Sequence, residues 1–131
     1  MAAHPPTSRR RPFTGGLRLG QAGGVFVRVW RYEVARGCEP EFERTYAPDG
    51  AWARLFARSD GFVGTELFAS LDRPGTYLTV DTFTDAAAWT SFLERHAAAY
   101  AALDRQGEGL TTSESEVVAA RVPGRAGSTE T

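Results

Sequence analysis

Three side chains in this sequence have the chemistry of an acid-base site. His96 could accept a proton from a phenol or an acidic carbon, because an imidazole changes its charge near neutral pH. Asp81 could do the same where burial disfavours its charged form. Arg28 could hold the resulting enolate or phenolate through charge-assisted hydrogen bonds. Two plainer interpretations stay open: His96 packs on a helix face, and Asp81 forms an ion pair with Arg28 across a sheet.

Aromatic residues near these three could stack a planar substrate. The candidate substrate contacts are Trp30, Tyr32, Tyr77, Phe83 and Trp89, with Thr79 and Glu66 as polar members. Trp89 also begins an apolar helical stripe, so a core position explains it equally well. Glu66 joins the set only if its side of the strand faces the cleft, which the alternation around Gly64 leaves open.

The composition excludes several kinds of chemistry. All 15 basic residues are Arg, so neither a Schiff-base Lys nor a phosphate-loop Lys is present. Cys38 is the single cysteine, which rules out an internal disulfide and a cysteine-based metal cluster. The two histidines, His4 and His96, are far apart in the sequence, and no dinucleotide glycine fingerprint occurs, so we expect no metal and no cofactor.

Composition also divides the chain. We expect a disordered basic leader over 1–24, one domain over 25–121 and a disordered tail over 122–131. After the leader, 11 Arg face 16 acidic residues, a balance of −5 that argues against a nucleic-acid groove. The run Arg9 to Arg11 lacks the apolar stretch of an export signal, and no segment is apolar enough to span a membrane, so we expect a cytoplasmic protein.

Hydrophobic periodicity predicts six elements within the domain. Strands are expected at 25–34, 62–71, 77–83 and 117–122, and helices at 41–57 and 84–103, the first broken or kinked near Pro48 and Gly50. The turn at 72–75 predicts an antiparallel hairpin. The order βαββαβ predicts a ferredoxin-like α+β fold in which an antiparallel sheet carries both helices on one face.

The first and third strands alternate, so each presents two different faces. We expect the helices to cover the face with Val27, Val29 and Val80. The aromatic face, with Phe26 and Trp30 among its members, would then be too large to leave in water. We therefore expect the same face of a second copy to cover it, giving a twofold homodimer with a ligand cleft between the subunits.

Four phrases resemble the antibiotic-biosynthesis-monooxygenase-like family of the dimeric α/β-barrel superfamily. They are YAPDGAW at 46–52, GFVGTEL at 61–67, YLTVD at 77–81 before Phe83, and YAALD at 100–104, and the similarity covers nearly all of 25–121. The resemblance implies a homodimer. Members of this family include cofactor-independent oxygenases of polyphenolic polyketides, heme-degrading enzymes and proteins of unassigned function.

The site residues of that family are only partly matched. Its quinone-forming oxygenases use an Asn and a Trp on the third strand and a Tyr on the next helix, positions that correspond here to Thr79, Phe83 and Trp89. Its heme-degrading members need an Asn on the first strand, where this chain has Trp30, and a Trp and a His on the second helix. The chain contains no Asn, and the two helix positions hold Phe92 and Ala102, so we do not expect heme degradation.

Three hypotheses follow for the function. The first is a cofactor-independent oxygenase of secondary metabolism, in which Asp81 or His96 deprotonates a planar phenolic or anthrone-type substrate that then reacts with O₂. The second is a non-catalytic ligand-binding or stress-response dimer that uses the same cleft. The third is a dimer with a dry sheet interface that only assists the assembly of a larger biosynthetic complex.

Overall fold

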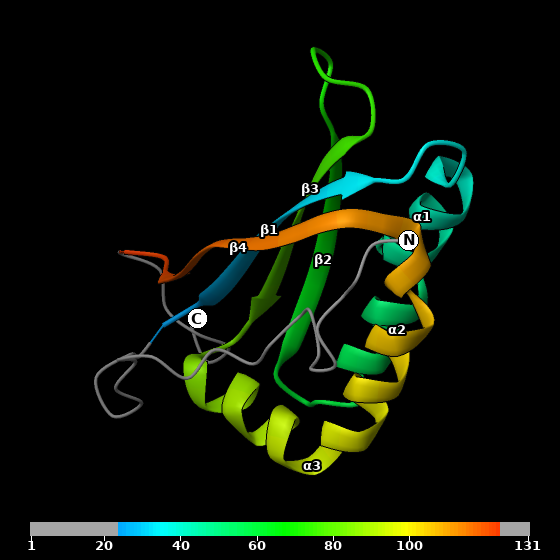
Figure 1. Cartoon of the computed structure of the whole chain (residues 1–131). Coiled ribbons are helices and arrows are strands. Elements are labelled where there is room, and N and C mark those ends of the chain that lie inside the picture. The colour runs from blue at the N-terminus through cyan, green and yellow to red at the C-terminus, as the bar shows by residue number, and fades with distance from the viewer. Residues whose placement is uncertain (1–23, 124–131) are drawn as a thin grey trace.

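The computed structural model describes residues 24–123, so the predicted leader and tail lie almost entirely outside the described residues (Figure 1). Four strands form one antiparallel sheet in the order β2-β3-β1-β4. The elements in chain order are β1 (Phe26–Val34), α1 (Glu39–Tyr46), α2 (Ala51–Phe56), β2 (Phe62–Ala69), β3 (Thr76–Phe83), α3 (Ala86–Gln106), a short 3₁₀ helix (Glu108–Leu110) and β4 (Thr111–Arg121). The predicted ferredoxin-like α+β fold is confirmed, although β4 begins six residues earlier than we expected.

The predicted break in the first helix separates α1 from α2. Gly50 is the N-cap of α2, and a Cβ atom at this position would overlap the carbonyl oxygens of Arg44 and Thr45. Only glycine permits so close an approach of the backbone to the end of α1. The break lets two short helices follow the curvature of the sheet, and their buried side chains include Phe42, Tyr46, Trp52 and Phe56.

The helix α3 starts on a side-chain cap and bends in its middle. The Asp85 carboxylate accepts a hydrogen bond of 2.8 Å from the backbone N–H of Ala88. His96 has a non-helical backbone, with φ −126° and ψ 28°, so α3 is kinked at this residue. In Figure 1 the part of α3 after the kink rises beside α2, whereas the part before it runs under the sheet.

The predicted assignment of the two sheet faces was wrong. Phe26, Arg28, Trp30 and Tyr32 are each at most 3% exposed, and their face lies under the helices. The rings of this face contact helix aromatics, for example Tyr32 with Phe42 at 5.2 Å between ring centres. Alternation defines two faces but does not say which one meets the helices, and here large rings on both layers fill the space between them.

The opposite face of the sheet carries the smaller aliphatic residues and is open. Val27, Val29 and Val80 on it are half-buried, Leu78 is 37% exposed and Phe68 is 48% exposed. We call this surface the open face. Among residues 24–123, no helix is both long enough and apolar enough to cross a membrane.

Candidate active site

Arg28 lies at the centre of a buried polar cluster between the sheet and α3. Its side chain is fully buried, and its Nε donates to a carboxylate oxygen of Glu116 on β4 at 3.1 Å. Its guanidinium carbon lies 4.4 Å from the ring centre of Trp89 and 5.2 Å from that of Trp30. Such contacts between a desolvated cation and aromatic faces are worth up to about 2 kcal/mol. Arg28 therefore connects two strands and a helix.

Asp81 lies directly opposite Arg28 in the pairing of β1 with β3, as the interpretation of an ion pair across the sheet requires. The Asp81 side chain is 2% exposed, and its carboxylate accepts a hydrogen bond of 2.8 Å from the Thr65 hydroxyl. Sequence reasoning missed Thr65. The hairpin register could have found it, because β2 places Thr65 opposite Asp81.

The other polar groups on this face are also engaged within the protein. The hydroxyls of Tyr32 and Thr79 lie 3.0 Å apart and share a buried hydrogen bond. The Tyr77 hydroxyl donates to the Glu43 carboxylate of α1 at 2.6 Å. Burial, together with this hydrogen bond and the negative charge of Glu43, raises the pKa of Tyr77 to about 12. The phenol of Tyr77 therefore stays neutral over the physiological range.

Trp89 carries a buried donor that the surrounding protein does not use. The side chain is 1% exposed, and its Nε1 has no hydrogen-bond partner among the residues that the structure describes. Leaving such a group without an acceptor costs about 1–3 kcal/mol. The Trp89 ring stacks on Phe92, with ring centres 5.7 Å apart and an angle of 21° between the planes.

His96 faces a pocket instead of the sheet. This pocket, which we call the His96 pocket, has a volume of about 400 Å³ and lies between the first half of α3 and the turn that leads into β2. Its walls include Arg58, Ser59, Thr84, Phe92, Arg95 and His96. The half-buried imidazole lies on the Phe92 ring, with ring centres 5.2 Å apart, and forms no hydrogen bond within residues 24–123.

The two candidate bases therefore lie in different surroundings. Asp81 is buried under the helices in the cluster of Arg28, whereas His96 lines the open pocket. The connection between them is the ring series from His96 through Phe92 to Trp89, whose ring then meets Arg28. The structure thus brings Arg28, Asp81 and Trp89 together and leaves His96 on the outer side of Phe92.

The remaining candidate substrate contacts lie on different faces of the sheet. Trp30, Tyr32, Tyr77, Thr79 and Phe83 belong to the face under the helices, as Trp89 does from α3. Glu66 is on the other side of the sheet, because it pairs with Val80 on the open face, so it does not join them. Sequence reasoning also missed Arg58 and Arg95 of the His96 pocket, since only the tertiary structure brings a turn and a helix together there.

A metal site would need several ligating side chains in one place. Within the described part of the chain, no group of three His, Cys, Asp or Glu residues is arranged to hold a metal ion. What the His96 pocket offers is one imidazole, two guanidinium groups, two carboxylates (Asp60 and Asp85) and several hydroxyls beside the Phe92 ring. The imidazole of this set can accept a proton, and its guanidinium groups can stabilise an anion.

Comparisons with known proteins agree with this architecture. The model of a family described as antibiotic biosynthesis monooxygenase matches residues 25–102. No curated protein gives a significant match.

SnoaB, a cofactor-independent oxygenase from Streptomyces nogalater, is 26% identical with a TM-score of 0.54, over 78% of this chain and 99% of SnoaB. A putative antibiotic biosynthesis monooxygenase from Nitrosomonas europaea is 15% identical with a TM-score of 0.62, over 80% of this chain and 96% of that protein. MhuD, solved with manganese protoporphyrin IX, is 24% identical with a TM-score of 0.59, over 78% of this chain and 98% of MhuD. The last two likenesses carry the fold alone.

Proposed function

Because the chain belongs to the antibiotic biosynthesis monooxygenase family, we propose that it is a cofactor-independent oxygenase of a planar phenolic or anthrone-type small molecule in secondary metabolism. The observation that carries this proposal is the His96 imidazole, which faces a pocket of about 400 Å³ and lies on the Phe92 ring. A pocket of this size is within the range that holds a small-molecule ligand. The likeness to SnoaB supports the reaction class.

In the proposed reaction His96 is the base. The imidazole takes a proton from the activated CH₂ group of the substrate, and Arg58 and Arg95 stabilise the enolate oxygen. The carbanion forms a new C–O bond with O₂, and the imidazolium returns its proton to the peroxide. Loss of the second C–H proton then breaks the O–O bond, and the departing hydroxide takes up that proton. One CH₂ group and one O₂ give one C=O group and one water.

Arg28 and Asp81 have a supporting role in this proposal. Asp81 is 2% exposed and bonded to Thr65, and Arg28 is fully buried and bonded to Glu116, so neither group reaches the His96 pocket directly. Arg28 instead fixes the ring of Trp89, on which Phe92 stacks. The arginines of the pocket therefore stabilise the enolate, which is the role that we expected of Arg28.

We further propose that two copies pair through the open face. This face exposes part of Leu78, Phe68 and Val118, an apolar surface that a second copy of the same face would cover. Family membership supports the pairing and the resulting dimeric α/β barrel. The ligand pocket would then lie within each subunit, outside the barrel.

A non-catalytic ligand-binding dimer is the second candidate. The observation that favours it concerns Thr79, which takes the position of the Asn in the family's quinone-forming oxygenases. The Thr79 hydroxyl is already engaged in a hydrogen bond of 3.0 Å with the Tyr32 hydroxyl. This candidate requires saturable binding of the aromatic compound with no product.

The test measures oxygen uptake and product mass with a panel of anthrones and hydroquinones and no added cofactor. The variants are His96→Gln, Asp81→Asn and, as the matched control, His4→Gln at the other histidine of the chain. We expect turnover by the wild type, a fall of roughly 100-fold or more in His96→Gln, and no change in His4→Gln. Binding without oxygen uptake would establish the ligand-binding dimer. Turnover that survives in His96→Gln and is lost in a folded Asp81→Asn would make Asp81 the base.

A further inference from the structure

The edge strand β2 carries an unpaired carboxylate on the open face of the sheet. Glu66 pairs with Val80 in the ladder between β2 and β3, so its side chain lies on the open face with that of Val80. Glu66 is exposed and forms no hydrogen bond or ion pair within residues 24–123. A second copy that covers this face would take the carboxylate partly out of water, which is costly for an unpaired charge.

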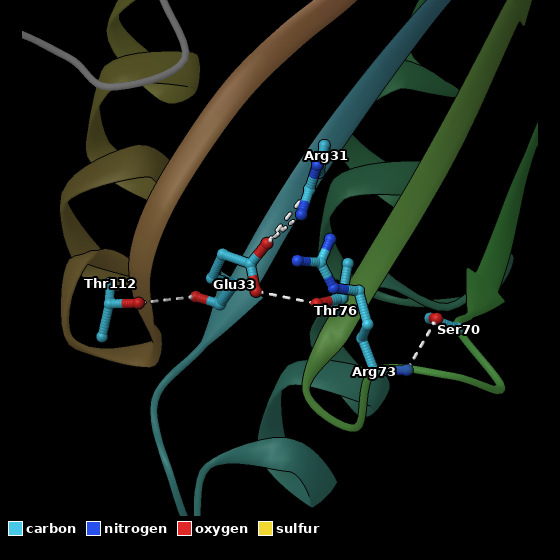
Figure 2. Close-up of polar contacts among 6 residues, drawn as sticks. All are labelled: Arg31, Glu33, Ser70, Arg73, Thr76 and Thr112. Carbon is cyan, nitrogen blue, oxygen red and sulfur yellow. Dashed lines mark hydrogen bonds and ion pairs between the residues drawn. The ribbon is translucent and has the colours of Figure 1, made fainter.

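Arg31 on β1 belongs to the same face and is held in place by Glu33, two residues further along the strand. Its Nε and one terminal nitrogen donate to the same Glu33 oxygen, at 3.0 Å and 2.8 Å. The other Glu33 oxygen accepts from the Thr76 hydroxyl at 2.7 Å. Both Glu33 oxygens are therefore already engaged within one copy (Figure 2).

Arg73 is presented by the turn that joins β2 to β3. Its backbone N–H donates to the Ser70 hydroxyl at 3.0 Å, and its carbonyl accepts from the N–H of Thr76 at 3.0 Å. Figure 2 shows the Arg73 side chain extending from the turn toward the guanidinium of Arg31. The Arg73 guanidinium forms no hydrogen bond or ion pair within residues 24–123, and the neighbouring Asp72 is exposed and does not pair with it.

The charges at this end of the open face do not balance within one copy. The hydrogen bonds from Thr76 and Arg31 lower the pKa of Glu33 despite partial burial, so Glu33 is ionised at neutral pH. Arg31 and Arg73 thus place two positive charges beside one negative charge. Glu66, elsewhere on the same face, carries a negative charge that has no partner among the described residues.

We propose that Arg73 of each copy forms an ion pair with Glu66 of the partner subunit, an inference that rests on the twofold pairing of the open face in the proposed function. In a twofold interface one residue of each copy meets a second residue of the other, so the pair forms twice. Neither charge is then left without a partner beside the apolar contact. The two pairs fix how one sheet lies on the other, because the aliphatic side chains of the open face attract without direction.

The test measures the dissociation constant of the dimer by fluorescence-detected sedimentation of the full chain. We expect Arg73→Glu and Glu66→Arg each to weaken the dimer by at least roughly tenfold, because like charges then meet twice in the interface. The variant with both changes should return to within roughly threefold of the wild type, since the pair is restored with its charges exchanged. Arg105→Glu, at an exposed arginine in the last turn of α3 on the other side of the sheet, is the control and should dimerise like the wild type.

Three outcomes would overturn the proposal. The first is a wild-type dimer whose dissociation constant neither single reversal changes. The second is a double variant that dimerises as weakly as the single variants, which shows that the two residues act independently. The third is a monomeric wild type, which would also overturn the pairing of the open face. Arg73 and Glu66 lie outside the His96 pocket, so a lack of oxygen uptake would overturn the proposed reaction and not the ion pair.

Discussion

The guanidinium carbon of Arg28 on β1 lies 4.4 Å from the ring centre of Trp89 on α3. This contact joins the middle of the sheet to the half of α3 that precedes the kink at His96. Phe92 stacks on the same Trp89 ring and also contacts His96. The position of the proposed base therefore depends on a buried cation on another element.

Replacing Arg28 with Met should strongly destabilise the protein. The change leaves Glu116 and Asp81 without the cation that faces them, and breaking a buried charge pair from one side costs about 3–5 kcal/mol. Urea unfolding measures the loss. In the double variant Arg28→Met, Glu116→Gln, part of the stability should return, because one uncompensated charge is removed. A loss below about 1 kcal/mol in the single variant would show that Arg28 does not connect these elements.

The stability of the wild type should fall at alkaline pH because of Tyr77. Its pKa is raised to about 12 in the folded protein from 10.0, so the stabilisation is complete below pH 10 and is lost as the pH rises toward 12. In Tyr77→Phe this part of the pH dependence should disappear. Urea unfolding at intervals between pH 9 and pH 12 checks the prediction. If the free energy of unfolding falls equally with pH in the two proteins, Tyr77 is not the cause of the loss.

Gly61→Ala should lower the free energy of unfolding by about 1–3 kcal/mol. A Cβ atom at Gly61 would overlap the Cβ of Ala88 and come within 2.8 Å of the Thr84 hydroxyl, so the turn and α3 would have to separate. Gly109→Ala is the matched control, because nothing lies within 4 Å of a Cβ atom there. Thermal unfolding of both variants should show a clear loss for the first and little change for the second.

Leu78→Asp should dissociate the proposed dimer. Leu78 is 37% exposed on the open face, and a carboxylate there would introduce a charge into the apolar contact between the two copies. Sedimentation should show monomers that retain the circular dichroism of the wild type. Leu71→Asp, at a turn residue that is 98% exposed, is the control and should remain dimeric. A dimer that survives Leu78→Asp would show that the interface lies on another surface.

Local residue patterns determined the order of the elements and the hairpin that pairs β2 with β3. Alternation and β-branched residues marked the strands, the residues around Pro48 and Gly50 broke the first helix, and Asp85 began α3. The short turn before β3 predicted the hairpin, and the placement of Arg28 and Asp81 on one face followed from the alternation. These features depend on neighbouring residues, so they can be predicted from the sequence.

Only the tertiary structure decided which face of the sheet meets the helices. Packing between layers selects that face, and here the aromatic side chains of β1 and β3 fill the space beside those of the helices, whereas the aliphatic face stays open. The kink at His96, the Thr65 contact to Asp81 and the His96 pocket also depend on residues distant in sequence. The sequence alone therefore determined the elements and the chemical groups, and three-dimensional packing decided which of those groups share a site.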